Sequence, residues 1–179
     1  MALELVGRFA KLQETIDALV ALYFQKRTPG LFWYLKQKRA TANISDSDRP
    51  KLLLTIADDL QAAGDRSAFS EVFVKVKVIR DYVGHGSRVE TPDPDTLVIT
   101  KNTVIGFASK EEPDLTVRRD ELAARLLDLE WLMQHVLYVM ATRGLVEKVS
   151  LGDHEVRPAL PPGLPSDWDG SMWESGRSR

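Results

Sequence analysis

The sequence predicts a mainly α-helical fold: an antiparallel helical bundle with a small β-hairpin insertion and a disordered C-terminal tail. Three stretches carry apolar residues at alternating spacings of three and four, which places those residues on one face of an α-helix. Two short β-rich runs interrupt this pattern, and the last 28 residues have no apolar period. We therefore expect one helical domain over residues 1–150 and a flexible tail over residues 151–179.

The first helix is the plainest prediction, and it ends at Thr28-Pro29-Gly30, because Pro lacks a backbone donor and Gly favours a turn. The aromatic run at residues 31–35 should be a further short helix. The apolar face of the first helix consists of Leu5, Phe9, Leu12, Ile16, Leu19 and Tyr23.

Three more helices follow. Asp48 is a candidate N-cap before Pro50, and Gly64 should close that helix. A second helix covers residues 67–83, where the 3.6-residue period outweighs the many β-favouring Val residues. The last helix begins near Thr116 or Asp120 and ends near residues 143–144.

The sequence between the last two helices predicts strands. Residues 91–95 contain two Pro and read as a loop, and residues 97–100 and 103–107 are rich in β-formers. Lys101-Asn102 lies between these runs, which predicts a small hairpin.

The end of the chain holds four Pro and four Gly within residues 152–179, which favours a flexible tail. Trp168 and Trp173 stand out there, either as residues that dock on a groove or as part of an unstructured end.

Composition excludes several classes of function. The 179 residues contain no Cys, which excludes disulfide scaffolds, thiolate metal sites and a cysteine nucleophile. The net charge of −2 excludes a protein that coats nucleic acid by bulk charge. Charged residues interrupt the N-terminal apolar residues, and no apolar run is long enough for a membrane span. We expect a cytoplasmic protein with no membrane partner.

Positive charge gathers in the first half of the chain. Residues 1–90 carry 14 basic and 11 acidic side chains, a net charge of +3, and the remainder carries a net charge of −5. Residues 26–39 contain five basic side chains and no acidic one. Such a run either contacts phosphates or forms a solvated helix surface.

The three histidines show no metal-binding pattern. His85, His135 and His154 lack the spacing of metal ligands, and neither an HExxH nor a Walker sequence occurs, so we expect no metal and no cofactor. His135 lies beside the apolar stripe of the last helix and is expected to serve packing or the surface.

One short motif combines groups that act on phosphodiesters. Arg80 and His85 lie in Arg-Asp-Tyr-Val-Gly-His-Gly, where Gly84 and Gly86 predict that the helix ends beside His85. A guanidinium group offers phosphate a planar fork of donors, and an imidazole exchanges protons near neutral pH. These two groups are the minimum required to cleave RNA without metal. A helix C-terminus with an exposed histidine is the simpler interpretation of the same spacing.

The motif resembles the Arg-x4–6-His signature of HEPN domains (higher eukaryotes and prokaryotes nucleotide-binding), over about residues 1–150. The position after the Arg is usually polar and often Asn in that family, and it is Asp81 here. The resemblance implies an antiparallel helical bundle that dimerises, so that two Arg/His motifs face each other in one composite site. Active members are metal-independent endoribonucleases, often toxins or antiviral defence effectors, that leave 2′,3′-cyclic phosphate and 5′-hydroxyl ends.

Carried onto this chain, the resemblance assigns a role to each residue of the motif. Arg80 would bind the scissile phosphate, His85 would be the general acid or base, Asp81 would orient either of them, and Tyr82 would line the site. The expected partners are RNA, a second copy of the chain, and an antitoxin or regulatory protein. The basic residues expected to contact RNA are Lys36, Lys38 and Arg39.

Two other functions fit the same sequence. A non-catalytic helical scaffold would use the apolar stripes for dimer contacts and the Trp-bearing tail to recruit a partner. A nucleotide-binding regulatory module would be stabilised by ATP or GTP, because a ligand that binds only the folded state raises apparent stability.

Overall fold

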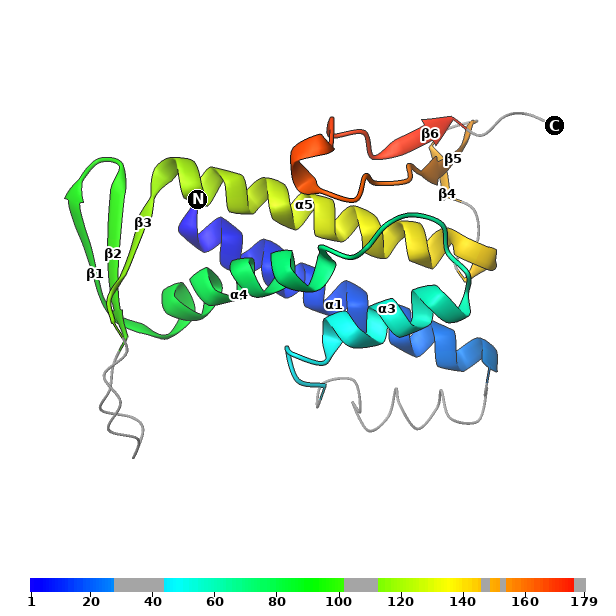
Figure 1. Cartoon of the computed structure of the whole chain (residues 1–179), viewed down its shortest axis with the longest axis horizontal. Coiled ribbons are helices and arrows are strands. Elements are labelled where there is room, and N and C mark those ends of the chain that lie inside the picture. Colours follow the sequence, from blue (N-terminus) through cyan, green and yellow to red (C-terminus); the bar gives the residue numbers. More distant parts are fainter. Residues whose placement is uncertain (28–43, 102–112, 146–148, 152–153, 176–179) are drawn as a thin grey trace.

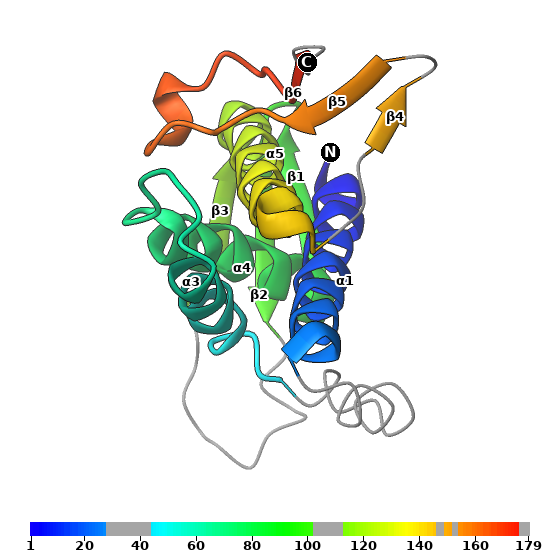
Figure 2. The ribbon, with the colours of Figure 1, turned by 90° about the vertical axis from the view of Figure 1, so that its right-hand side faces the viewer.

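The computed structural model of the chain describes residues 1–27, 44–101, 113–145, 149–151 and 154–175 (Figure 1). Within these ranges the fold is mainly α, as predicted. Helix α1 packs against the other three described α-helices, which lie to its left in Figure 2. These helices are α1 (Ala2–Arg27), α3 (Arg49–Asp59), α4 (Phe69–His85) and α5 (Arg119–Ala141).

The predicted apolar face of α1 lies at the centre of the core. The helix ends at Arg27, directly before the Thr28-Pro29-Gly30 breaker, as predicted. Tyr23, at the end of the stripe, is half-buried, and its hydroxyl donates to Asp59 Oδ2 at 2.9 Å. The remaining residues of the predicted face are fully buried: Leu5, Phe9, Leu12, Ile16 and Leu19.

The boundaries of the other helices follow the sequence closely. Asp48 is the N-cap of α3, although its side chain makes no capping hydrogen bond. Helix α3 ends at Asp59, earlier than predicted, because Gln61 already has a positive φ of 52°, and Gly64 lies in the following turn with a φ of 104°. A short 3₁₀ turn, η3 (Thr142–Gly144), follows α5. None of the helices described here is long and apolar enough to cross a membrane.

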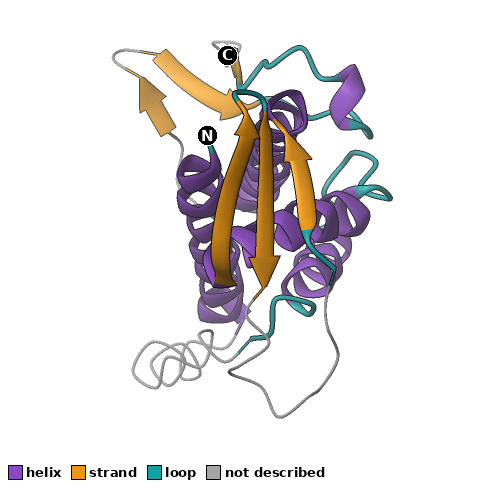
Figure 3. Ribbon diagram, turned by 90° about the vertical axis from the view of Figure 1, so that its left-hand side faces the viewer, coloured by secondary structure: helices purple, strands orange, loops and turns teal. Residues whose placement is uncertain are grey.

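The chain between α4 and α5 forms a three-stranded antiparallel sheet, which lies at one end of the helices (Figure 3). It consists of β1 (Gly86–Asp93), β2 (Thr96–Lys101) and β3 (Leu115–Arg118), with β2 in the centre. The predicted strand at 97–100 is confirmed. The loop predicted at 91–95 is partly wrong, because residues 91–93 belong to β1. Pro92 is tolerated there because β1 is an edge strand, and Pro94 lies in the turn between β1 and β2. The second predicted strand, residues 103–107, lies outside the described residues.

The prediction of a disordered tail is wrong for the described residues 154–175. They include β5 (His154–Pro158), the 3₁₀ turn η4 (Pro165–Asp167) and β6 (Trp173–Ser175). Strand β5 pairs with β6 and with β4 (Val149–Leu151), and this C-terminal segment runs along α5 (Figure 1). Trp168 packs against the helical core, whereas Trp173 is 40% exposed.

Side chains of α5 hold this C-terminal segment through its backbone. Trp131 Nε1 donates to the carbonyl oxygen of Pro162 at 2.9 Å, and Gln134 Nε2 donates to the carbonyl oxygens of Ala159 and Met172 at 2.7 and 2.8 Å. The C-terminal segment has no apolar periodicity, and its carbonyl oxygens hold it on α5 by accepting hydrogen bonds from Trp131 and Gln134. No residue from 131 to 142 is charged. Such a stretch is typical of a helix covered on more than one face.

Candidate functional site

His85 is the last residue of α4, and the chain enters β1 at Gly86 (Figure 1). A Cβ atom at Gly86 would lie 2.7 Å from the carbonyl oxygen of Tyr82 and 2.5 Å from Ile99 Cγ2, so only glycine fits this close approach. A Cβ at Gly84 would meet nothing within 4 Å. The side chain of His85 is exposed. Its predicted position at a helix C-terminus is confirmed, and Gly86 is the glycine that the geometry requires.

Arg80 lies on the flank of α4 that faces α1. Its Nη2 atom is 2.7 Å from Asp46 Oδ2, and its Nη1 atom is 3.0 Å from Asp81 Oδ1. The guanidinium carbon lies 4.6 Å from the centroid of the Phe9 ring, within the range of a cation–π contact. These contacts hold the cation in place, and the side chain remains 18% exposed to solvent.

Arg80 and His85 point to different sides of α4. A separation of five residues corresponds to a rotation of about 140° and a rise of about 7.5 Å along an α-helix. No hydrogen bond or ion pair joins the two side chains in the part of the chain that the structure describes. A single copy therefore does not bring the guanidinium and the imidazole of the motif together.

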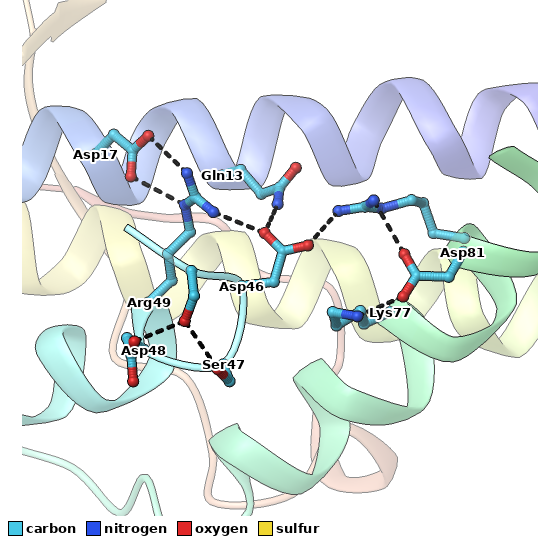
Figure 4. Close-up of polar contacts among 10 residues, drawn as sticks. Gln13, Asp17, Asp46, Ser47, Asp48, Arg49, Lys77 and Asp81 are labelled. Atoms are coloured by element: carbon cyan, nitrogen blue, oxygen red, sulfur yellow. Dashed lines mark hydrogen bonds and ion pairs between the residues drawn. The ribbon is translucent and has the colours of Figure 1, made fainter. Parts of the chain in front are cut away.

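Asp46 is the centre of a polar network that the sequence did not reveal (Figure 4). It lies in the turn before α3 and accepts hydrogen bonds from Gln13 of α1, Arg49 of α3 and Arg80 of α4. The Arg49 Nη1 atom lies 2.6 Å from Asp46 Oδ1. One carboxylate thus ties together three helices beside the Arg80 end of the motif.

Arg49 is anchored from its other side by Asp17 of α1. Its Nε and Nη2 atoms donate to the two oxygens of Asp17 at 3.0 and 3.1 Å. Burial alone would lower the pKa of Arg49, but the hydrogen bonds and charges of Asp17 and Asp46 outweigh burial and raise that pKa. Arg49 is therefore a permanent cation, although its side chain is only 9% exposed.

The network is electrically balanced. Lys77 of α4 pairs with Asp81. The cations of the network are Lys77, Arg49 and Arg80, and its acids are Asp17, Asp46 and Asp81. Arg80 therefore faces two acids, and the surroundings of the motif carry no net charge with which to attract an RNA phosphate.

Tyr82 connects α4 to the sheet. Its hydroxyl donates to the carbonyl oxygen of Pro113 at 2.9 Å, and Lys101 Nζ lies 4.7 Å from the centroid of its ring. Tyr82 is half-buried and lies three residues before the exposed His85. These contacts fix the orientation of the sheet relative to the end of α4.

Sequence reasoning found the motif and missed its electrostatic partners. Gln13, Asp17, Asp46 and Arg49 are ordinary polar residues in the sequence, and Asp46 is separated from Arg80 by 34 positions. Nothing in the sequence distinguishes an Arg that faces a distant acid from one that faces solvent. The three basic residues expected to contact RNA, Lys36, Lys38 and Arg39, lie outside the described residues.

Within the described ranges, no group of three or more His, Asp or Glu side chains is arranged to hold a metal ion. Comparison with known proteins gives no further guide: no protein family, curated protein or solved structure matches this chain. The arrangement around α4 is therefore the ground on which a function is proposed.

Proposed function

We propose that the chain is a metal-independent endoribonuclease of HEPN type that acts as a homodimer in a toxin or phage-defence role. Its helices would form the antiparallel bundle of that family, with the small hairpin inserted after the motif. The observation that carries the proposal is the placement of Arg80 and His85: a semi-exposed guanidinium followed, at the end of the same helix, by an exposed histidine.

The reaction needs an acid, a base and a cation. One His85 removes the proton from a ribose 2′-hydroxyl, whose oxygen attacks the adjacent phosphorus and expels the 5′-oxygen of the next nucleotide. That oxygen takes a proton from an acid in the composite site, so the products are a 2′,3′-cyclic phosphate and a 5′-hydroxyl. Arg80 donates to the phosphoryl oxygens, where negative charge accumulates in the transition state. No water molecule enters the step.

The outward face of α4 supports a composite site made by two copies. Val74, Val78, Asp81 and His85 follow one another at spacings of four, three and four, so they share one side of the helix. Val74 and Val78 are 52% and 44% exposed, which is unusual for two adjacent apolar residues in the middle of a helix. Parallel pairing of this stripe with its copy, about a two-fold axis that runs along the helix, would bury both valines and bring the two His85 residues close together.

One observation favours the alternative of a non-catalytic scaffold. Arg80 is paired with both Asp46 and Asp81, which compete with phosphate for its donors. A scaffold would use the same ion pairs to hold α1, α3 and α4 together, and its Arg80 would never bind RNA. The two functions differ in their response to substitutions at His85, which makes no contact in this network.

Cleavage of single-stranded RNA in EDTA tests the proposal. His85→Ala should reduce the rate at least about 100-fold, as expected for the loss of a general acid or base. His154→Ala, a histidine of β5 outside the motif, is the matched control and should keep the rate of the unsubstituted protein. Equal cleavage by His85→Ala and the unsubstituted protein, with the same products, would refute the assignment.

Arg80 requires a more conservative pair of variants because it also packs on Phe9. Arg80→Lys keeps the charge and loses the planar fork, so it should fold and cleave more slowly. Arg80→Ala should abolish cleavage. Circular dichroism and the unfolding midpoint of each variant separate a loss of chemistry from a loss of structure.

A further inference from the structure

The carboxylate of Asp46 is held by donors from three elements (Figure 4). Gln13 Nε2 and Arg49 Nη1 donate to Oδ1, and Arg80 Nη2 donates to Oδ2. Two guanidinium groups and an amide that converge on a pair of oxygens form an arrangement well suited to a phosphate group. An anion-binding site is thus built between α1, α3 and α4, and a carboxylate of the chain itself fills it.

The two guanidinium groups of this site are held by contacts that do not involve Asp46. Asp17 holds two nitrogens of Arg49 and leaves Nη1 directed at Asp46. Asp81 and the ring of Phe9 hold Arg80 from its other sides. The two guanidinium groups therefore have anchors that remain when Asp46 leaves, and such preorganisation lowers the entropic cost of binding an anion.

Among the acids of the network, Asp46 is the one that lies outside a helix. Asp17 and Asp81 lie inside α1 and α4, whereas Asp46 lies in the turn that precedes α3. The backbone hydrogen bonds of this turn run from the amides of Asp48 and Arg49 to the carbonyl oxygen of Ser45. Rotation of the Asp46 side chain breaks neither of them, and this side chain is 22% exposed, much like those of Asp17 and Asp81.

We infer that the Asp46 carboxylate occupies the place of an RNA phosphodiester, and that a bound phosphate displaces it and takes Gln13, Arg49 and Arg80 as its ligands. The identity of the anion as RNA rests on the proposed function, whereas the anion site itself does not. Displacement also solves the problem of charge, because removal of one acid from the balanced network leaves a net charge of +1 around the phosphate. The turn at residues 45–48 then acts as an internal competitor that weakens the binding of RNA.

Asp46→Asn tests this inference, because it removes the charge and preserves the shape. The probes are inorganic phosphate and a single-stranded RNA with 2′-O-methyl riboses, which binds and cannot be cleaved through its 2′-oxygen. We expect the variant to bind both probes up to about fivefold more tightly at about 0.1 M salt, the size of effect expected for loss of a partly exposed competing ion pair. Asp59→Asn is the matched control: it removes the same charge from a residue paired with Arg27 and should leave both affinities unchanged.

A second substitution shows whether the gain arises at this site. Gln13→Ala, added to Asp46→Asn, removes a neutral donor and should reverse part of the gain, whereas a general electrostatic effect would be insensitive to it. Asp46→Ser repeats the test with a residue well suited to turns if the Asn variant fails to fold. Unfolding midpoints of all variants are measured alongside.

The outcomes separate this inference from the proposed nuclease function. Tighter phosphate and RNA binding by Asp46→Asn, without cleavage by any variant, supports the anion site and refutes the nuclease. Unchanged or weaker binding by a folded Asp46→Asn or Asp46→Ser variant overturns the inference even if the unsubstituted protein cleaves RNA. Asp46 would in that case only position Arg80.

Discussion

His135 is buried in α5 without any exposed surface, between the rings of Phe69 and Trp131. Neither of its ring nitrogens has a hydrogen-bond partner among the described residues. Burial lowers the pKa of His135 from 6.5 to about 4, and the positive charge of Arg66 acts in the same direction, while the nearby carbonyl oxygen of Pro162 and the charge of Asp65 oppose it. The folded protein therefore holds a neutral imidazole at a pH at which the unfolded chain already binds a proton.

The sign and size of the pH effect follow directly. Because the folded pKa lies below the unfolded pKa, acidification favours the unfolded chain, and the free energy of unfolding falls as the pH drops through the window from 6.5 to 4. Each pH unit inside this window costs about 1.4 kcal/mol. We expect His135 to cost the protein about 2 kcal/mol between pH 7 and pH 5.

Other titrating groups oppose His135 or act mainly below pH 5. The pKa values of several exposed carboxylates, such as Asp65 and Glu71, are lowered by hydrogen bonds, and their stabilising effect is lost mainly below pH 5. Burial raises the pKa of Asp128, so this carboxyl group favours the folded state on acidification and acts in the opposite direction. Between pH 7 and pH 5, His135 should dominate.

Urea unfolding followed by tryptophan fluorescence at pH 7, 6 and 5 measures the effect. His135→Phe fills nearly the same volume beside Trp131 and does not titrate, so its free energy of unfolding should change by less than about 0.5 kcal/mol over the same range. If His135→Phe loses stability as steeply as the unsubstituted protein, a group other than His135 is responsible and the reasoning fails.

Three further predictions concern stability and assembly. Gly84→Ala should be neutral or should stabilise the protein by up to about 1 kcal/mol, because a Cβ atom there meets nothing within 4 Å. Gly86→Ala should destabilise the protein by more than about 2 kcal/mol in thermal unfolding, because a Cβ atom there would clash. Equal effects of the two substitutions would contradict the close approach at Gly86. Gln134→Ala removes the side-chain donor to the carbonyl oxygen of Ala159 and one of the two donors to that of Met172, which keeps the Ala159 amide. The substitution should cost about 1–3 kcal/mol in urea unfolding, with faster amide exchange in residues 158–172. Unchanged exchange there would show that Gln134 does not hold the segment. Val78→Glu should convert a dimer to a monomer in sedimentation, while Leu3→Glu, at an 84% exposed position of α1, should not; a persisting Val78→Glu dimer would place the interface elsewhere.

The helices were predictable because burial of one helix face is a local property of the sequence. The stripe of α1 from Leu5 to Leu19 repeats every three or four residues, and each of its members is fully buried. The same reasoning located the end of α1 and the position of His85 at the end of α4, where local breakers act within a few residues.

The C-terminal segment was not predictable in this way. Its order depends on carbonyl oxygens that accept hydrogen bonds from Trp131 and Gln134, side chains that are between 25 and 38 positions away. A backbone acceptor leaves no mark on the sequence, and a run rich in Pro and Gly looks the same whether it is packed or free. The absence of charge in residues 131–142 was the available signal.

By itself, the sequence determined a mainly helical protein with an Arg and a His at the end of one amphipathic helix, because periodicity and helix breakers act over short distances. Only the tertiary structure decided the electrostatic state of that Arg. The acid that meets Arg80 in space comes from a turn 34 residues earlier in the chain, and the strength of an ion pair depends on distance and burial, not on sequence separation. Whether Arg80 is free to bind phosphate is thus decided by Asp46, a residue that no local pattern connects with the motif.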